Sequence, residues 1–372
     1  MRSIRLLVMV EQLRRSAPGG IGTYVSGLLK GLDTLGPGAT PDFELLASRP
    51  SGNGRRSGPL AAPGHPVHSS PLPGPLLTRA WDHGLLRAPR GFDVVHATSL
   101  STLEPGRAAL VATVHDLLWR RVPNAYPDRG RAWHEAALRR ALRRADRFIV
   151  PAQAVADDLQ LAGARRDAIT IIPMGSDHLP PPDLDAAGTL LSRLGVSGPF
   201  LLSVGTLEPR KNQARLIEAY ERVRDRLPEP WPLVMVGPTG WGQQVKPGAG
   251  VVLAGSVSPP ELAALYAMAR LLAYVPLIEG FGIPPIEAMA LGAPVVASPL
   301  PSTAGAAFEV DPHDVESIAA GLLQVATDED ERSRLQSRGL DRSSELTWSA
   351  VARRHLAVWS EAADLVRGPT RG

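Results

Sequence analysis

The stretch RLLAYVPLIEGFGIPPIEA, residues 270–288, indicates the fold because it changes from a strand pattern to a helix pattern within one short segment. Residues 270–275 are an apolar run that predicts a buried parallel strand, and Pro276 ends it. Residues 277–284 then form a loop, and Pro285 suits the first position of a helix. A strand that leads through a loop into a helix is the unit of a doubly wound α/β sheet, which binds ligands beyond the carboxyl ends of its strands.

Two glutamates flank this turn, Glu279 in the loop and Glu287 in the first turn of the predicted helix. Carboxylates only accept hydrogen bonds, and the vicinal hydroxyls of a sugar supply two donors at a suitable spread. The glycines would let the backbone approach a ligand closely, and the loop amides at the positive end of the helix suit hydroxyls or a phosphate. These loop residues are Gly280, Phe281, Gly282 and Ile283. The alternative is a solvated loop glutamate and a helix-start charge favoured by the helix dipole.

The same pattern of strand, loop and helix recurs along both halves of the chain. Around residues 178–198 it breaks and then restarts, which predicts two doubly wound domains, 1–178 and 179–345, with a ligand site in the cleft between them. Residues 49–75, rich in Pro, Gly and Ser, predict a long surface loop. The predicted strands are 4–10, 43–47, 93–97, 109–114, 147–152 and 169–173, then 199–206, 233–237, 250–255, 270–275 and 294–298, and helices are predicted at 20–33, 131–145 and 153–162.

The stretch SVGTLEPRKN, residues 203–212, repeats the arrangement at the start of the second domain. Arg210 and Lys211 follow the carboxyl end of a strand and precede an amphipathic helix, a position that favours anions. Adjacent guanidinium and ammonium groups there suit a diphosphate. The alternative is an exposed basic turn.

The first domain adds two motifs at strand ends. SAPGGIGTY, residues 16–24, opens a helix after the first strand, so that Gly19 and Gly20 admit a phosphate or sugar close to the backbone. Its GGxG spacing differs from the GxGxxG of dinucleotide-binding folds, and no acidic residue ends the second strand. VATVHDLLW, residues 111–119, ends a strand with His115, which can donate to a substrate hydroxyl or move a proton near neutral pH. Most single histidines do neither.

Composition narrows the function classes. The 372 residues contain no cysteine, which excludes disulfides, Cys-ligated zinc and thiol catalysis and favours a cytoplasmic location. No apolar run approaches the roughly 18 residues of a membrane span. Residues 1–175 hold 23 Lys and Arg against 14 Asp and Glu, a charge of +9, whereas the remainder holds 17 against 23, or −6. A basic first half predicts an anionic partner, either a phosphate or an anionic membrane surface.

One helical pattern concentrates this basic charge. Residues 129–147 carry seven arginines around an apolar stripe, which is typical of a solvated helix packed on its domain. The alternative hypothesis is peripheral contact with an anionic membrane at the inner face, which would present a lipid-linked acceptor. The arginines assigned to that contact are Arg139, Arg140, Arg143 and Arg144.

The motifs GGIGTY, TVHDL, VGTLEPRKN and EGFGIPPIE, in this order over nearly the whole chain, resemble the retaining glycosyltransferases of family 4, which have the two-domain GT-B fold. The resemblance implies transfer of a hexose from a nucleotide diphosphate sugar, with no metal or other cofactor and with the anomeric configuration kept. It also implies that a C-terminal helix, 346–366, crosses back to the first domain. The acceptor would be a glycan, a lipid-linked sugar or a small glycoside, and no nucleic acid is expected. Likeness of EGFGIPPIEAMALG to bacterial mannosyltransferases favours GDP-mannose, with UDP and dTDP sugars next.

The resemblance also implies roles by position. Arg210 and Lys211 would hold the diphosphate and Glu287 the ribose diol. Glu279, with the amides after it, would hold the hydroxyls of the donor sugar, and His115 would contact that sugar near the reacting carbon. The residues expected to approach the donor through their backbone are Gly19 and Gly20 in the first domain, and Gly237 and Val257 around the base.

One segment departs from the family pattern. Residues 299–312 read PLPSTAGAAFEVDP, shorter than the serine-rich loop and Pro-Glu-Val segment common in the family, so contacts from that loop are not carried over. Two other functions remain open, a GT-B epimerase acting on a nucleotide sugar and a catalytically silent scaffold, because a fold alone does not establish chemistry.

Overall fold

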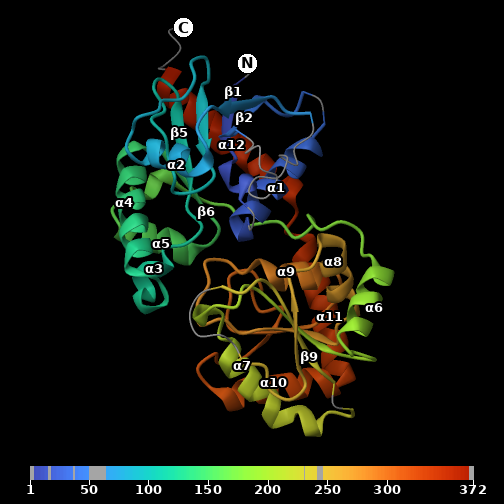
Figure 1. Cartoon of the computed structure of the whole chain (residues 1–372). Coiled ribbons are helices and arrows are strands. Elements are labelled where there is room, and N and C mark those ends of the chain that lie inside the picture. The colour runs from blue at the N-terminus through green and yellow to red at the C-terminus, as the bar shows by residue number, and fades with distance from the viewer. Residues whose placement is uncertain are drawn as a thin grey trace. The chain divides into compact units, whose positions relative to one another are not determined.

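The computed structural model describes residues 4–15, 18–36, 38–49, 64–229, 231–240 and 246–367. It divides the chain into two compact units, here called unit 1 (Met1–His178 with Trp348–Gly372) and unit 2 (Leu179–Thr347). Each unit is a parallel sheet covered by helices (Figure 1). The predicted α/β class with two doubly wound sheets is therefore confirmed.

In unit 1 the described strands form one parallel sheet in the order β3-β2-β1-β4-β5-β6-β7. The chain winds from β1 to one side and then to the other, so the strand order reverses between β1 and β4. Open α/β sheets bind ligands beyond the carboxyl ends of the strands at such a switch point. The strands are β1 (Arg5–Met9), β2 (Asp42–Ser48), β3 (Val67–Ser70), β4 (Val94–Ala97), β5 (Ala109–Thr113), β6 (Arg147–Val150) and β7 (Ile169–Ile171).

Helices cover both faces of this sheet, and the last of them comes from the end of the chain. α12 (Trp348–Arg367) packs against α1 (Gly19–Asp33), β4 and β5, and Figure 1 shows its red ribbon beside the blue one. Two glycines of α1 permit this approach: a Cβ on Gly27 would lie 2.1 Å from Trp348 Cε2, and one on Gly31 would lie 2.2 Å from the Trp348 carbonyl oxygen. The predicted return of the C-terminal helix is confirmed. The other helices are α2 (Gly74–Asp82), α3 (Leu118–Arg121), α4 (Asp128–Arg144) and α5 (Gln153–Leu161).

A buried polar cluster joins α1, α12 and the sheet. Tyr24 Oη lies 2.8 Å from Thr113 Oγ1 and 2.7 Å from His355 Nε2, and His96 Nε2 lies 2.9 Å from Thr113 Oγ1. His355 Nδ1 donates to the Val351 carbonyl at 2.8 Å, so its Nε2 accepts from Tyr24. Burial lowers the pKa of His355 to about 4 and holds the pKa of His96 well below its ordinary value, so both imidazoles are neutral.

In unit 2 the described strands are again parallel, in the order β10-β9-β8-β11-β12-β13, with the switch point between β8 and β11. Neighbouring residues of one strand point to opposite faces: Leu201 joins the core under α7 and α10, and Leu202 joins the core under α6, α8 and α9. The strands are β8 (Leu201–Val204), β9 (Leu233–Val236), β10 (Val251–Gly255), β11 (Leu271–Tyr274), β12 (Val295–Ala297) and β13 (Phe308–Glu309). The helices are α6 (Leu184–Arg193), α7 (Gln213–Val223), α8 (Pro259–Met268), α9 (Ile283–Ala290), α10 (Val315–Thr327) and α11 (Glu329–Ser344).

The sequence prediction was wrong in three segments. The surface loop predicted at 49–75 contains β3 and the start of α2. Both elements are short and lie among prolines, so their apolar residues form no clear period in the sequence. Residues 50–63 of that loop lie outside the described residues. Residues 178–198, where the pattern of strands and helices was expected to break, contain α6, which Asp183 caps by accepting from the Ala186 amide at 2.9 Å. Helix α9 begins at Ile283 rather than Pro285, because proline is tolerated throughout the first turn.

Within the described part of the chain, no helix is both long enough and apolar enough to span a bilayer.

Candidate functional site

The switch point of unit 2 brings together three residues that the sequence singled out. Arg210 and Lys211 lie in η4 (Pro209–Lys211), a 3-10 turn after β8, and Glu279 lies in the loop after β11. Since β8 and β11 are neighbours in the sheet, the two loops meet at its carboxyl edge. The Arg210 carbonyl accepts from the Leu277 amide at 3.0 Å, which fastens one loop to the other.

Asn212 holds the basic turn in place. It adopts the left-handed conformation, with φ of 62°, which asparagine tolerates better than most residues. Its side-chain Nδ2 donates to the Val275 carbonyl at 3.0 Å and to the Pro312 carbonyl at 2.7 Å. These two hydrogen bonds tie the turn that carries Arg210 and Lys211 to the end of β11 and to the segment after β13.

Glu279 is the centre of the resulting network. Its Oε1 accepts from Arg210 Nη1 at 2.6 Å, from Lys211 Nζ at 2.5 Å and from Tyr274 Oη at 3.1 Å. Lys211 Nζ also donates to Tyr274 Oη at 2.6 Å, and Arg210 Nη2 donates to Glu208 Oε1 at 2.5 Å. The charged side chains are at most 15% exposed, so the alternatives of a solvated glutamate and an exposed basic turn are wrong.

The surroundings keep Glu279 ionised and Tyr274 protonated. Burial alone would raise the pKa of Glu279, but Lys211 and then Arg210 outweigh it, and the pKa lies below its ordinary value. Burial, followed by the charge of Glu279, holds the pKa of Tyr274 well above its ordinary value, so its hydroxyl remains a donor. The cluster of two cations and two carboxylates is therefore close to neutral within itself.

Glu208 and Tyr274 were missed by the sequence analysis. Glu208 stands two positions before Arg210, and this spacing in TLEPRKN was the available signal. Tyr274 lies at the last position of β11 and reads in sequence as one more apolar strand residue.

Glu287 lies deeper than the sequence predicted. It stands in the second turn of α9, is 6% exposed, and accepts from Tyr266 Oη of α8 at 2.7 Å. Burial and then Glu287 hold the pKa of Tyr266 well above its ordinary value. The alternative interpretation of Glu287, a charge in the first helical turn favoured by the helix dipole, is therefore wrong. The negative charge of Glu287 also helps to raise the pKa of Tyr274, after burial and Glu279.

The glycines of unit 2 serve close approaches of backbone. Gly282 caps the start of α9 with φ of 90°, and a Cβ there would lie 3.1 Å from Ser302 Oγ. Gly237, after β9, has φ of 145°, and a Cβ would lie 2.1 Å from the Gly205 carbonyl oxygen. Val257 follows β10 and packs against the core under α8, whereas Gly280 and Phe281 are buried and Ile283 is half-buried. These contacts are structural, and the donor contacts assigned to these residues stay predictions.

In unit 1, His115 follows β5 as predicted, but its ring N–H already donates to a backbone carbonyl. Its Nε2 lies 2.9 Å from the Thr98 carbonyl, which can only accept, so Nε2 carries the proton and Nδ1 is the acceptor. Burial lowers the pKa of His115, and its ring packs edge-on against Tyr24 at a centroid distance of 4.9 Å. A neutral His115 with this contact presents an acceptor at Nδ1, and its predicted contact with the donor sugar and its role in moving a proton stay predictions.

Gly19 and Gly20 are the first residues of α1, and both are exposed. Gly19 has φ of 60°, and within the described residues nothing lies within 4 Å of the position of a Cβ. Gly22, the third glycine of the motif, is buried, and a Cβ there would lie 2.2 Å from Pro18 Cβ. Gly19 therefore leaves open space, whereas Gly22 is needed for packing.

The basic face predicted on α4 is wrong in two of its four members. Arg140 pairs with Asp82 at 2.5 Å and is 12% exposed, and Arg144 pairs with Glu104 at 2.5 Å and is 16% exposed. These ion pairs fasten α4 to the end of α2 and to the segment after β4. Arg139 and Arg143 remain exposed. Membrane contact stays a prediction, and only two of the four arginines assigned to it are exposed for that contact.

Comparison with known proteins completes this picture. Residues 18–178 match the family described as Glycosyltransferase Family 4, and residues 193–342 match Glycosyl transferases group 1. The chain is 30% identical over 350 residues to a D-inositol 3-phosphate glycosyltransferase of Xylanimonas cellulosilytica, covering 81% of this chain and 80% of that protein. The chain belongs to glycosyltransferase family 4. The resemblance noted in the sequence is therefore confirmed.

Other relatives of this family 4 glycosyltransferase are also sugar transferases by name. O-antigen chain mannosyltransferase B of Escherichia coli is 31% identical over 254 residues, covering 64% of this chain and 66% of that protein. The chain spans only 25% of a longer Escherichia coli mannosyltransferase, WbdA. Among solved structures, HepE of Anabaena in complex with UDP-glucose matches 96% of this chain and 100% of its own with a TM-score of 0.69 at 18% identity. This likeness confirms the GT-B fold.

Proposed function

We propose that the protein transfers a hexose from a nucleotide diphosphate sugar to a glycan, lipid-linked or small-glycoside acceptor, with retention of anomeric configuration and without a metal. The carrying observation is the meeting of Arg210, Lys211 and Glu279 at the switch point of unit 2. Two cations and a carboxylate there match the two parts of such a donor, its diphosphate and its sugar hydroxyls.

The cations act on the leaving group. Departure of a nucleoside diphosphate builds negative charge on its oxygens, and donors that are already fixed in place stabilise that charge more in the transition state than before it. Lys211 Nζ uses two of its three N–H groups on Tyr274 and Glu279, and no described residue takes the third. In the proposal, that third N–H and the guanidinium of Arg210 bind the diphosphate.

Glu279 connects the two parts of the donor. Its Oε1 carries three hydrogen bonds from protein groups, so a diphosphate that draws Lys211 and Arg210 toward itself leaves this oxygen able to accept from a sugar hydroxyl. Binding of the leaving group and recognition of the sugar are then coupled through one carboxylate. Glu287, held by Tyr266, is proposed to accept from the ribose hydroxyls.

The donor sugar of the proposal is mannose on GDP. It is supported by the names of the Escherichia coli relatives, which are mannosyltransferases, and the solved structure named above with UDP-glucose keeps UDP sugars as the next choice. We assign to His115 an acceptor contact through Nδ1 with a hydroxyl of the donor sugar.

Thermal shift with a panel of GDP, UDP, dTDP and ADP hexoses tests the proposal. The matching donor at 100 times its dissociation constant stabilises the protein by about 2.7 kcal/mol, and the other sugars shift the midpoint less. Transfer to a glycan acceptor is then followed by NMR of the anomeric proton, with and without EDTA. Failure of every nucleotide sugar to bind contradicts the proposal. Donor turnover without any acceptor would point to an epimerase, and inversion or loss of rate with EDTA would correct the mechanism.

A further inference from the structure

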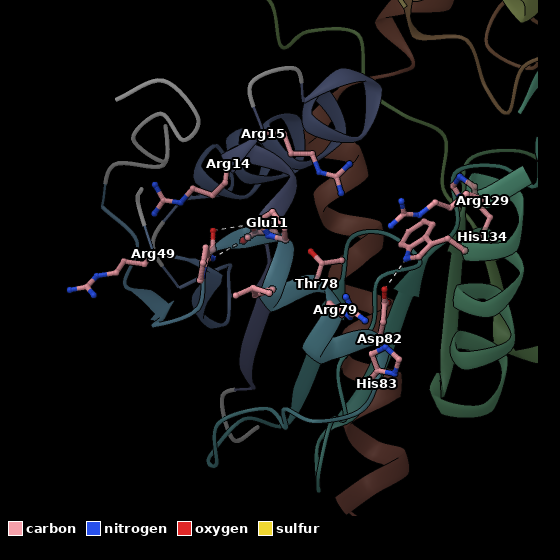
Figure 2. A pocket seen from close by; sticks show the side chains of 16 residues that line it. Glu11, Arg14, Arg15, Arg49, Thr78, Arg79, Asp82, His83, Arg129 and His134 are labelled. Carbon is pink, nitrogen blue, oxygen red and sulfur yellow. Dashed lines mark hydrogen bonds between the residues drawn. The ribbon is translucent and has the colours of Figure 1, made fainter. Parts of the chain in front are cut away.

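A large pocket lies wholly within unit 1, with a volume of about 1350 Å³ (Figure 2). It is lined from the segments that follow β1, β2 and β3 and from the first turns of α4. It therefore lies at the carboxyl edge of the sheet, on the side of the switch point formed by β1. This is the position at which a doubly wound sheet binds a ligand.

Arginines dominate the charge of this pocket. Arg14, Arg15, Arg49, Arg79 and Arg129 line it, against the two carboxylates Glu11 and Asp82. Such an excess of one sign in a concave site raises the local concentration of anions.

Both carboxylates already serve groups of the protein. Glu11 accepts from the Ser48 amide at 2.6 Å and from Ser48 Oγ at 2.9 Å. Asp82 accepts from Arg140 at 2.5 Å and from Trp133 Nε1 at 2.7 Å, and Arg140 is not part of the pocket lining. Asp82 is therefore paired with a cation outside the lining, whereas Glu11 is held by neutral donors and keeps its negative charge; the five lining arginines still outnumber the two lining carboxylates.

Three of the arginines face the interior. In Figure 2 Arg15, Arg79 and Arg129 reach into the space between η1 (Glu11–Arg14) and α4, whereas Arg14 and Arg49 lie on the far side of Glu11. All three are exposed, and none of them has a carboxylate partner within the part of the chain that the structure describes. Guanidinium groups that point into a cavity without a carboxylate are suited to a phosphoryl group, which they bind through paired N–H donors.

We propose that Arg15, Arg79 and Arg129 bind a phosphate or diphosphate ester carried by the acceptor. This rests on the proposed function, because it names the class of acceptor that the transferase uses. The indole of Trp133 and the exposed side chain of Leu76 also line the pocket and give the non-phosphate part of the acceptor an apolar surface. A phosphorylated sugar or polyol and a lipid-linked sugar diphosphate share this chemistry.

Inorganic pyrophosphate is the probe, titrated by calorimetry into the full chain. The proposal predicts two sites in the parent protein, one in each unit. Arg15→Gln, Arg79→Gln and Arg129→Gln each weaken the unit 1 site by about tenfold or more, the loss expected for one charge-assisted contact. Arg166→Gln is the matched control, since Arg166 is an exposed arginine of unit 1 outside the pocket lining.

The Lys211→Ala background separates this inference from the proposed function. Pyrophosphate binding that persists in Lys211→Ala and is lost on adding Arg79→Gln supports the unit 1 site. Loss in Lys211→Ala alone, with the arginine variants unchanged, overturns it and leaves the donor site standing. Nucleotide-sugar binding that fails while the arginine site remains contradicts the proposed function and not the anion site.

Transfer assays identify the source of the phosphate. The acceptors compared are methyl α-mannoside, α-mannose 1-phosphate, and a polyprenyl diphosphate mannose in phosphatidylcholine vesicles. A KM that rises in Arg79→Gln for either phosphorylated acceptor, with kcat nearly unchanged, supports the proposal and assigns a soluble or a lipid source. Equal KM values for the phosphorylated and unphosphorylated acceptors, indifferent to Arg79→Gln, would overturn it.

Discussion

Units 1 and 2 have the same sheet topology around their switch points but treat basic side chains in opposite ways. In unit 2, Arg210 and Lys211 are mostly buried and bonded to Glu279 and Glu208. In unit 1, Arg15, Arg79 and Arg129 are exposed, while the carboxylates nearby are bonded elsewhere.

This difference separates two ways of binding an anion. A buried, internally compensated network holds its charges in fixed positions, and breaking one partner leaves an unpaired buried charge. Exposed arginines attract an anion from solution and are screened by salt. We infer that unit 2 is organised for charge that develops during the reaction, and unit 1 for capture of a ligand that is already charged.

The largest expected effect comes from breaking the unit 2 network. Glu279→Ala leaves Arg210 and Lys211 without their shared carboxylate and should destabilise unit 2 by about 3–5 kcal/mol. Calorimetric unfolding measures it, with the exposed Glu229→Ala as control, expected to stay within about 0.5 kcal/mol. A further Lys211→Ala substitution should cost less than the sum of the two single changes. Equal stabilities of Glu279→Ala and Glu229→Ala would show that the network is not formed.

Acid should destabilise unit 1 at a higher pH than unit 2. His355, with a folded pKa of about 4, and His96 take up protons in the unfolded chain more readily than in the folded one. The stability that their neutral forms provide is present above pH 6.5 and is lost as pH falls toward 4, by about 3 kcal/mol for His355. Glu279 also has a lowered pKa, but its contribution is lost only below about pH 4.5.

Hydrogen exchange followed from pH 7 to pH 5 tests this, with unit 1 amides losing protection before unit 2 amides. His355→Gln should reduce the pH dependence of unit 1. Uniform loss of protection across both units would contradict the assignment of the histidines.

The joint between α1 and α12 gives a smaller effect that is confined to unit 1. Gly27→Ala places a Cβ 2.1 Å from the Trp348 ring and should cost about 1–3 kcal/mol. Gly188→Ala in α6 of unit 2 is the matched change, with nothing within 4 Å, and should stabilise by up to about 1 kcal/mol. Thermal unfolding of the two variants should shift in opposite directions. A destabilised Gly188→Ala would undermine the packing on which this comparison depends.

Salt gives the smallest effect and sharpens the contrast directly. Raising ionic strength from about 0.05 M to about 0.5 M should weaken pyrophosphate binding at the exposed arginines of unit 1 several-fold, and less at the buried cations of unit 2. The first site is measured in Lys211→Ala and the second in Arg79→Gln. An equal salt dependence would remove the distinction between the two sites.

The sequence was enough to bring Arg210, Lys211 and Glu279 to one place because the carboxyl ends of adjacent parallel strands share one edge of the sheet. The convergence of Arg210, Lys211 and Glu279 follows from that rule alone. Their mutual pairing did not, since it depends on Glu208, whose one signal was its place two positions before Arg210, and on the hydroxyl of Tyr274, which reads as a core residue.

Unit 1 was less predictable because its interactions join distant segments. Arg140 and Arg144 share a helix face with Arg139 and Arg143 in sequence, yet their partners Asp82 and Glu104 lie about 40 to 58 residues away. Arg15, Arg79 and Arg129 come from three separate segments and form a site only when the sheet is folded.

The role of Lys211 is the most direct test of the donor site. The rate constant at saturating donor and acceptor is measured for Lys211→Ala and for Lys246→Ala, an exposed lysine of the same unit. The donor-site account predicts that the rate constant falls by about 100-fold or more in Lys211→Ala, measured at a temperature at which the variant is fully folded, and is unchanged in Lys246→Ala. Equal rate constants for Lys211→Ala and the parent protein would contradict it.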